Sequence, residues 1–163
     1  MLSFEDERVK REAFKALLPL YSLKAAAGYF GRGEAVEPEG WLEAEGVGKL
    51  DERMFVCRAV GRSMEPSIRD GDLIVFRANP AGTRQGKVVL AQYRGPEDPD
   101  TGGTFTVKRY SSEKAAADES SWRHTRIVLS PTNPAYQPIL LDADDEESVQ
   151  VLAELVTVLR GAG

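Results

Sequence analysis

The segment GRSMEPSIRDGDLIVF, residues 61–76, joins a predicted tight turn to an apolar run. Gly61 lets the backbone turn sharply just before Ser63, and Pro66 stiffens the chain just after it. Such a turn directs backbone N–H groups near Ser63 toward a common point, where they can stabilise an oxygen that becomes negative during a reaction. The apolar run at residues 73–77 predicts a β-strand. The segment therefore predicts a serine presented on a turn that leads into a strand.

A second segment, GGTFTVKRY at residues 102–110, places Lys108 45 residues after Ser63. A serine hydroxyl is a weak nucleophile at neutral pH, so it needs a neighbouring base to take its proton. A lysine amine can accept that proton only when neutral, and burial against apolar side chains such as Phe105 and Val107 favours the neutral form. A lone turn serine or strand lysine carries almost no functional signal. Together they predict a Ser-Lys catalytic dyad.

Short predicted strands alternate with turns through most of the chain, so the predicted fold class is mostly β. A length of 163 residues with 42% hydrophobic residues suits a single domain with a short tail. The expected strands cover residues 54–60, 73–77, 86–93, 104–110 and 126–129. The last apolar run, residues 149–159, fits a helical stripe or strand alternation, and its valines favour a strand.

The N-terminal residues predict a short helical arm. Apolar residues recur at roughly helical spacing over residues 4–17, and Pro19 is expected to end the helix. We expect this arm to pack on its own domain rather than on a partner. Glycine, proline and glutamate dominate residues 29–49, which predicts a long connection anchored by Trp41.

Several motifs together resemble one known family. GRSMEPSIRDGDLIVF, then GKVVLAQY (86–93), TFTVKRY (104–110) and NPAYQPI (133–139), resemble in this order the peptidase domain of the LexA and UmuD family of self-cleaving proteins. The resemblance runs from about Leu18 to the end of the chain. It implies a LexA-type fold of short strands and hairpins, with Ser63 as nucleophile and Lys108 as general base. It further implies an oxyanion hole made by the main-chain N–H groups of Arg62 and Ser63, and a homodimer to which the C-terminal end contributes.

The same resemblance implies a cleavage site upstream of the serine. LPLYSLKAAAG, residues 18–28, resembles the family's segment ending in Ala-Gly and points to the Ala27-Gly28 bond, 35 residues before Ser63. A peptide that enters a narrow site as an extended strand needs small side chains near the cut, and residues 25–28 are all small. The local sequence fits a helix tail ending at Gly28 equally well. The dyad at the matching distance favours the scissile bond.

The expected cut divides the chain into an arm, residues 1–27, and a LexA-like peptidase domain, residues 28–163. Full-length repressors of the family carry an N-terminal helix-turn-helix domain, which we expect 27 residues to be too few to form. In this layout the chain resembles UmuD. The resemblance then implies stimulation by the RecA filament on single-stranded DNA, followed by engagement of a repair polymerase or helicase.

Composition argues against other classes of function. Cys57 lies in the apolar run MFVCRAV and is expected in the core, and one cysteine with one histidine, His124, makes a poor zinc site. Phosphate-binding glycine patterns are absent, so neither a metal nor another cofactor is expected. The net charge of −5 and the acidic residues at 142 and 144–147 disfavour direct DNA binding. No apolar run approaches the length that spans a bilayer, and we expect a cytoplasmic location.

Two rival hypotheses remain. Bacterial signal peptidases share a Ser-Met-x-Pro box and a later Lys-Arg pair, but they are membrane-anchored and carry a further downstream box that this chain lacks. The other rival is a non-cleaving dimeric binding module that keeps the peptidase fold and docks on a repair or helicase partner. The acidic segment suits it, and so do two insertions, residues 95–103 and the polar residues 111–124. Both segments are expected to be extended hairpin ends, where extra length is tolerated.

Overall fold

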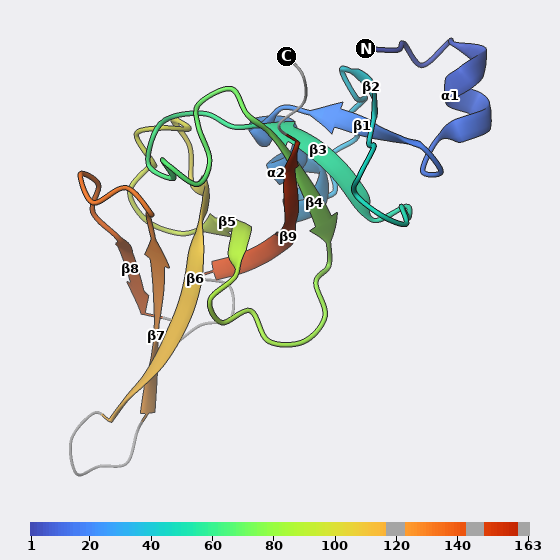
Figure 1. The fold of residues 1–163 in the computed structure, drawn as a ribbon. Helices are drawn as coiled ribbons and strands as arrows, with labels where there is room; N and C mark the ends of the chain where they lie inside the picture. Colours follow the sequence, from blue (N-terminus) through green and yellow to red (C-terminus); the bar gives the residue numbers. More distant parts are fainter. Residues whose placement is uncertain (117–122, 143–148, 160–163) are drawn as a thin grey trace.

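The computed structural model describes residues 1–116, 123–142 and 149–159, and within them most of the ordered structure is one nine-stranded sheet (Figure 1). Its strand order is β2-β1-β3-β4-β9-β5-β6-β7-β8. The strands are β1 (Leu17–Tyr21), β2 (Gly40–Glu43), β3 (Met54–Arg58), β4 (Leu73–Ala78), β5 (Val88–Tyr93), β6 (Phe105–Ala116), β7 (Arg123–Ser130), β8 (Ile139–Asp142) and β9 (Val149–Leu159). The helices are α1 (Glu7–Glu12) and α2 (Leu23–Arg32). The mostly β fold class is therefore confirmed.

All six predicted strands are present, with ends that shift by a few residues. The last apolar run is a strand, as its valines predicted, and β9 pairs with both β4 and β5. The polar insertion at 111–124 lengthens the β6–β7 hairpin, which projects from the body of the molecule (Figure 1). Residues 117–122 of that insertion, and the acidic residues 144–147, lie outside the described residues.

The prediction of one helix over residues 4–17 is wrong. α1 is a short helix whose first turn is capped by the Asp6 carboxylate, which accepts a hydrogen bond from the Arg8 backbone N–H at 2.8 Å. Leu17, Leu18 and Leu20 form a strand instead, because their side chains are fully buried in the core beside neighbouring strands. Tertiary burial here overrides the local helical spacing.

Pro19 does not end a helix but lies inside β1, opposite Trp41 of β2. The backbone N–H and C=O of Trp41 bond to Leu2, at 2.8 and 2.9 Å, and not to the proline. The missing N–H of Pro19 therefore leaves no gap in the β1–β2 ladder. Trp41 is a buried anchor, as predicted, and its ring meets Phe14 edge-on at 5.3 Å.

Helix α2 occupies the start of the segment predicted as a connection. The Ser22 hydroxyl caps it by accepting from the Ala25 N–H at 3.0 Å, and Gly33 ends it in a left-handed conformation. Its inner face contacts β1, β3, β5 and β9. Phe30 of α2 stacks on Phe55 of β3 at 4.5 Å, and Phe55 stacks on Phe76 of β4 at 5.7 Å.

The core that α2 covers also holds the serine segment in place. Met64 and Ile68, on either side of the turn that follows Ser63, are buried in the same cluster as Ala26 and Ala27 of the helix. The helix, the sheet and the serine turn thus share one hydrophobic core. Burial of Met64 and Ile68 in this core fixes the turn that carries Ser63.

Candidate active site

Ser63 lies on a tight turn that the local sequence builds. Gly61 has a φ of 85°, which favours glycine, and its N–H donates to the Asp70 carboxylate at 2.8 Å. Ser63 itself is only 5% exposed. The turn predicted from the glycine is therefore confirmed, and it presents a shielded serine.

Hydrogen bonds from Asn133, the first residue of the NPAYQPI motif, and from Thr132 before it hold this turn in place. The Asn133 amide Nδ2 donates to the Arg62 carbonyl at 3.0 Å, and the Asn133 backbone N–H donates to the Ser63 carbonyl at 3.0 Å. The Thr132 hydroxyl donates to the Glu65 carbonyl at 3.2 Å. The role of this motif could not be predicted from the sequence, because only the fold brings it beside the serine.

Lys108 points from β6 into the same region. Alternation along the strand puts Thr106 and Lys108 on one face, and Lys108 is 4% exposed. Its Nζ donates to the Thr106 hydroxyl at 2.7 Å and to the Asp98 carboxylate at 3.3 Å. The Thr106 hydroxyl in turn donates to Asp98. Lys108 is buried as predicted, but its amine contacts a hydroxyl and an acid, and is not surrounded by apolar side chains alone.

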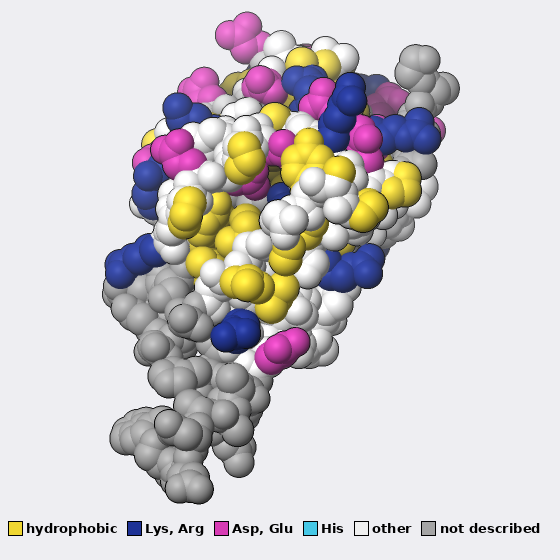
Figure 2. Space-filling model, turned by 90° about the vertical axis from the view of Figure 1, so that its left-hand side faces the viewer, with side chains coloured by type: hydrophobic (Ala, Val, Ile, Leu, Met, Phe, Trp, Pro, Cys, Tyr) yellow, Lys and Arg dark blue, Asp and Glu magenta, His cyan; other side chains and the backbone are white. Residues whose placement is uncertain are grey.

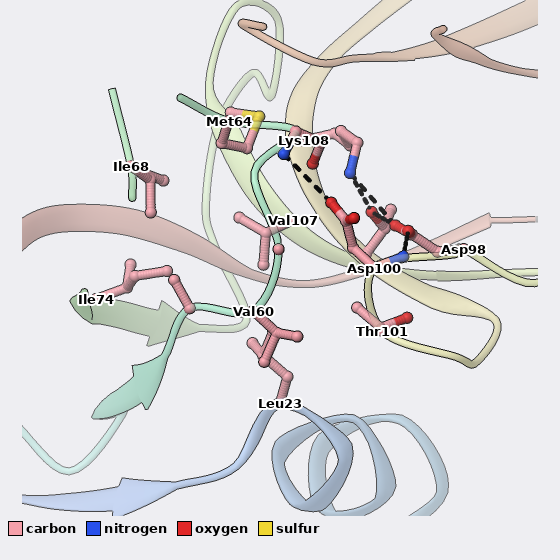
Figure 3. Close-up of a pocket in the computed structure, with 14 residues that line it drawn as sticks. Leu23, Val60, Met64, Ile68, Ile74, Asp98, Asp100, Thr101, Val107 and Lys108 are labelled. Atoms are coloured by element: carbon pink, nitrogen blue, oxygen red, sulfur yellow. Dashed lines mark hydrogen bonds and ion pairs between the residues drawn. The ribbon is translucent and has the colours of Figure 1, made fainter. Parts of the chain in front are cut away.

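Ser63 and Lys108 line one cavity, which the fold assembles from segments far apart in the sequence (Figure 3). Its apolar part includes Leu23, Met64 and Val107. The described hydrogen bonds of Lys108 Nζ go to Thr106 and Asp98, and none joins it to Ser63. The structure thus brings the two predicted residues into one buried space without linking their side chains.

The loop at residues 95–103 joins β5 to β6, as a hairpin end should, but it folds back over this cavity. Asp98 is 4% exposed and pairs with Lys108. Asp100 accepts a hydrogen bond from the Ser63 N–H at 3.2 Å, and Figure 3 shows its carboxylate directed toward the serine segment. One of the two N–H groups predicted to form the oxyanion hole is therefore already hydrogen-bonded to a carboxylate. From the sequence, residues 95–103 were predicted only as an extended hairpin end.

Sequence comparison gives a family for this arrangement. A family model described as Peptidase S24-like matches residues 19–156. The chain belongs to the S24-like peptidase family. This assignment confirms the resemblance to the peptidase domain of the LexA and UmuD family.

Two relatives of this S24-like chain are repressors. It is 31% identical over 97 residues to LexA repressor 2 of Pseudomonas syringae pv. tomato, which covers 59% of the chain and 39% of that repressor. It is 30% identical over 139 residues to the LexA repressor of Bordetella avium, which covers 84% of the chain and 55% of that repressor. The S24-like chain therefore spans about half, or less, of the length of these relatives.

The candidate cleavage site of the S24-like chain has a different local structure from the one expected. Ala27 and Gly28 are buried within α2, and the Gly28 carbonyl accepts from the Glu34 N–H at 3.1 Å. The helix does not end at Gly28 either, since its cap is Gly33. Leu23, at the first turn of α2, does line the Ser63 cavity. The segment thus starts at the site but is helical rather than extended.

An apolar groove of about 490 Å³ has Ser63 and Lys108 in its lining. The rest of the lining comes from β5, from residues 96–99 of the loop and from residues 135–141. Aromatic, proline and aliphatic side chains line it, among them Tyr93, Pro138 and Leu140. Figure 2 shows apolar side chains gathered on a face of the molecule, with charged ones mainly around them. Such a groove suits an extended segment with apolar side chains.

Packing accounts for Cys57, the other candidate nucleophile of the S24-like chain. Cys57 is fully buried in the core, and burial raises the pKa of its thiol, so it is not an alternative nucleophile. His124 lies on β7, opposite Ala115 of β6. The described residues include no metal-ligating cluster of three or more His, Cys, Asp or Glu residues. Nor does any described helix have the length and hydropathy of a membrane span.

Proposed function

We propose that the chain is a serine endopeptidase in which Ser63 is the nucleophile and Lys108 the general base. The observation that carries this proposal is the placement of both side chains, each about 95% buried, on one cavity within an S24-like fold. A neutral Lys108 amine takes the proton from Ser63 Oγ as the oxygen attacks a peptide carbonyl. The backbone N–H of Ser63, with that of Arg62, then stabilises the oxyanion.

The dyad is tested with two variants that remove one group each. Ser63→Ala removes the nucleophile and Lys108→Ala removes the base, so each is expected to abolish cleavage. Circular dichroism and urea unfolding should show that both variants still fold. The rate of the wild-type protein should rise between neutral and alkaline pH as the lysine loses its proton. Cleavage that persists in Lys108→Ala, or a rate that does not change with pH, would contradict a lysine base.

The proposed substrate is the chain itself, cut between Ala27 and Gly28. A peptidase site takes its substrate in extended form, so α2 must first open from Leu23 onward. Leu23 already lies at the cavity, and the bond to be cut is only about 6 Å further along the helix axis. The apolar groove beside the dyad then offers room for the opened segment.

Gly28→Glu tests that position. An added side chain at Gly28 meets the Glu34 carboxylate, whose end can move, so the folded helix should accept the change. In the active site the same side chain would stand next to the scissile bond, and we expect cleavage to stop. Gly33→Glu is unsuitable as a control because Gly33 has a left-handed backbone conformation, in which a glutamate would be strained. Glu34→Gln, which keeps the shape of the neighbouring side chain, provides the control. Unchanged cleavage in Gly28→Glu would refute the site.

The proposed assembly is a homodimer joined through the C-terminal strand. In the described part of the chain, residues 155–159 pair with β4 on one side and with no strand on the other. Their apolar side chains, including Val156 and Val158, are only partly buried. An open edge of this kind can pair with its copy in a second chain. Light scattering on the purified protein should give the mass of two chains, and a monomer at micromolar concentration would contradict this.

The proposed trigger is a RecA-like filament on single-stranded DNA, in a switch that serves the response to DNA damage in the cytoplasm. Such an activator need only favour the conformer in which α2 is open, because a ligand shifts populations through its differential affinity for two states. After cleavage, the shortened dimer would engage a repair polymerase or helicase. The assay compares cleavage near neutral pH with and without RecA, nucleotide and single-stranded DNA. Equal rates would exclude RecA as the trigger.

A second candidate function is a dimeric binding module that docks on a repair or helicase partner without cutting. The contacts that favour it are those of Asp98 with Lys108 and of Asp100 with the Ser63 N–H, which block both catalytic groups. One intact chain after long alkaline incubation would support this module over the peptidase.

A further inference from the structure

The 95–103 loop engages the very groups that catalysis by Ser63 and Lys108 requires. Asp98 pairs with the amine of Lys108, and Asp100 accepts from the N–H of Ser63. Both contacts come from one segment, residues 95–103, of the eleven-residue connection between β5 and β6. The loop thus touches the base and the oxyanion hole at the same time.

The Asp98 contact works against the chemistry expected of Lys108. Both side chains are shielded from water, and opposite charges attract strongly in such surroundings. If Lys108 lost its proton, the Asp98 carboxylate would remain buried without a counter-charge, which is unfavourable. The Thr106 hydroxyl, which donates to Asp98, further stabilises the carboxylate. The neutral amine that must accept the Ser63 proton is therefore penalised.

The Asp100 contact affects the other half of the site. An oxyanion that forms on the substrate needs the Ser63 N–H, but that donor is already bonded to Asp100 Oδ2 at 3.2 Å. The same carboxylate lies close against Gly61, where an added Cβ would be within 2.5 Å of it. A developing negative charge at this point would also be repelled by Asp100. Substrate must therefore displace the aspartate.

The loop is built to hold these two aspartates. The Asp98 N–H donates to the Gly103 carbonyl at 2.8 Å, and the Gly102 N–H donates back to the Asp98 carbonyl at 2.7 Å. The Asp100 N–H donates to Asp98 Oδ1 at 2.7 Å, which links the two acids directly. The Tyr93 hydroxyl fixes the start of the loop by donating to the Pro96 carbonyl at 2.8 Å.

We propose that the 95–103 loop is an internal inhibitor of the active site, in which Asp98 holds the Lys108 amine in an ion pair and Asp100 occupies the Ser63 N–H. Cleavage then requires that the loop moves away or loses these charges. The proposal rests on the proposed function, since it assigns a regulation to the same dyad. It explains why Lys108, the proposed base, is buried and yet paired with an acid.

A test of this proposal must separate the effect of Asp98 from that of the other titratable groups near Lys108. The titratable groups on the Ser63 cavity, besides Lys108, are Asp98 and Asp100. The adjoining groove adds Tyr93, Glu97 and Tyr136. Of these, only Asp98 forms an ion pair with the lysine in the described structure. Asp98→Asn keeps the shape of that side chain and removes its charge.

The test measures how fast Ser63 reacts with a fluorophosphonate probe, using the intact protein from pH 6 to pH 10. The amine takes the Ser63 proton, an O–P bond forms, and fluoride leaves, so the added mass reports nucleophile and base together. The variants are Asp98→Asn and Asp100→Ala, with Glu52→Gln as a charge-matched control on an exposed turn before β3. Ser63→Ala sets the background.

Each variant is expected to change the labelling rate in a different way. Asp98→Asn should label at least about tenfold faster than wild type at pH 7, because the Lys108 amine is no longer held in an ion pair with a carboxylate. Asp100→Ala should label faster by on the order of tenfold at every pH, without moving the profile, because it frees an oxyanion donor. Glu52→Gln should match wild type. Labelling of Asp98→Asn at or below the wild-type rate would overturn the proposal and make Asp98 a positioning residue for the lysine.

The outcome can be separated from that of the proposed function by following self-cleavage in the same samples. Faster labelling without any cleavage supports the inhibitory loop and refutes self-cleavage. Cleavage that is equally fast in wild type and both variants supports the peptidase and refutes the inhibitory loop. Circular dichroism checks folding. If Asp98→Asn does not fold, Asp100→Ala decides alone, and labelling no faster than wild type then overturns the proposal.

Discussion

Replacing Ser22 with alanine is expected to speed self-cleavage, because the change weakens the helix that holds the scissile bond. The Ser22 hydroxyl caps α2 by accepting from the Ala25 N–H at 3.0 Å. Loss of a serine N-cap destabilises a helix by about 1 kcal/mol. If α2 must open before Ala27-Gly28 reaches Ser63, the opening becomes easier by that amount. The cleavage rate should then rise about fivefold, since about 1.4 kcal/mol corresponds to a factor of ten.

The assay is a time course of intact mass at alkaline pH, with Ser22→Thr as the matched control. Threonine also caps helices, so its rate should stay close to that of wild type. Urea unfolding should show a loss of about 1 kcal/mol in Ser22→Ala and less in Ser22→Thr. If Ser22→Ala is destabilised but cleaves no faster than wild type, opening of α2 is not part of the rate-limiting step.

Three further predictions concern the parts that support the site. Asn133→Ala should slow cleavage about fivefold, because the carbonyl before Ser63 loses a hydrogen bond worth about 1 kcal/mol, and single-turnover rates would reveal it. Phe55→Ala should lower the free energy of unfolding by about 3–5 kcal/mol in urea titrations, since this fully buried ring stacks on Phe30. Burial, with the charges of Asp98 and Glu97, raises the pKa of Tyr93 to about 12. Neutral Tyr93 therefore stabilises the fold below about pH 10, and that contribution should disappear as pH rises through about 12, a dependence that Tyr93→Phe should lack in unfolding titrations.

The sheet and the local settings of Ser63 and Lys108 were predictable because their signals are local. Runs such as residues 73–77 and 86–93 combine apolar, β-branched side chains with flanking turns, and they form β4 and β5. The Ser63 turn and the Lys108 strand also carry their own motifs. Both therefore appear in the structure where the sequence predicted them.

The features that the sequence did not predict depend on contacts between segments that are far apart in the chain. Pro19 can occupy β1 because Trp41, its partner in β2, makes its own backbone hydrogen bonds to Leu2 and needs none from the proline. The small residues that suggested an extended cleavage segment serve equally well to pack α2 against the sheet. Asp98 looks like part of a solvated turn in the sequence, and only the closed hairpin carries it to Lys108.

The most direct test of the central claim is mass spectrometry of the purified wild-type chain after prolonged incubation at alkaline pH. Self-cleavage by the Ser63–Lys108 dyad predicts two fragments, residues 1–27 and 28–163, and their absence from a parallel Ser63→Ala sample. A single intact mass in the wild-type sample would contradict self-cleavage. Fragments that also appear in Ser63→Ala would show that another nucleophile makes the cut.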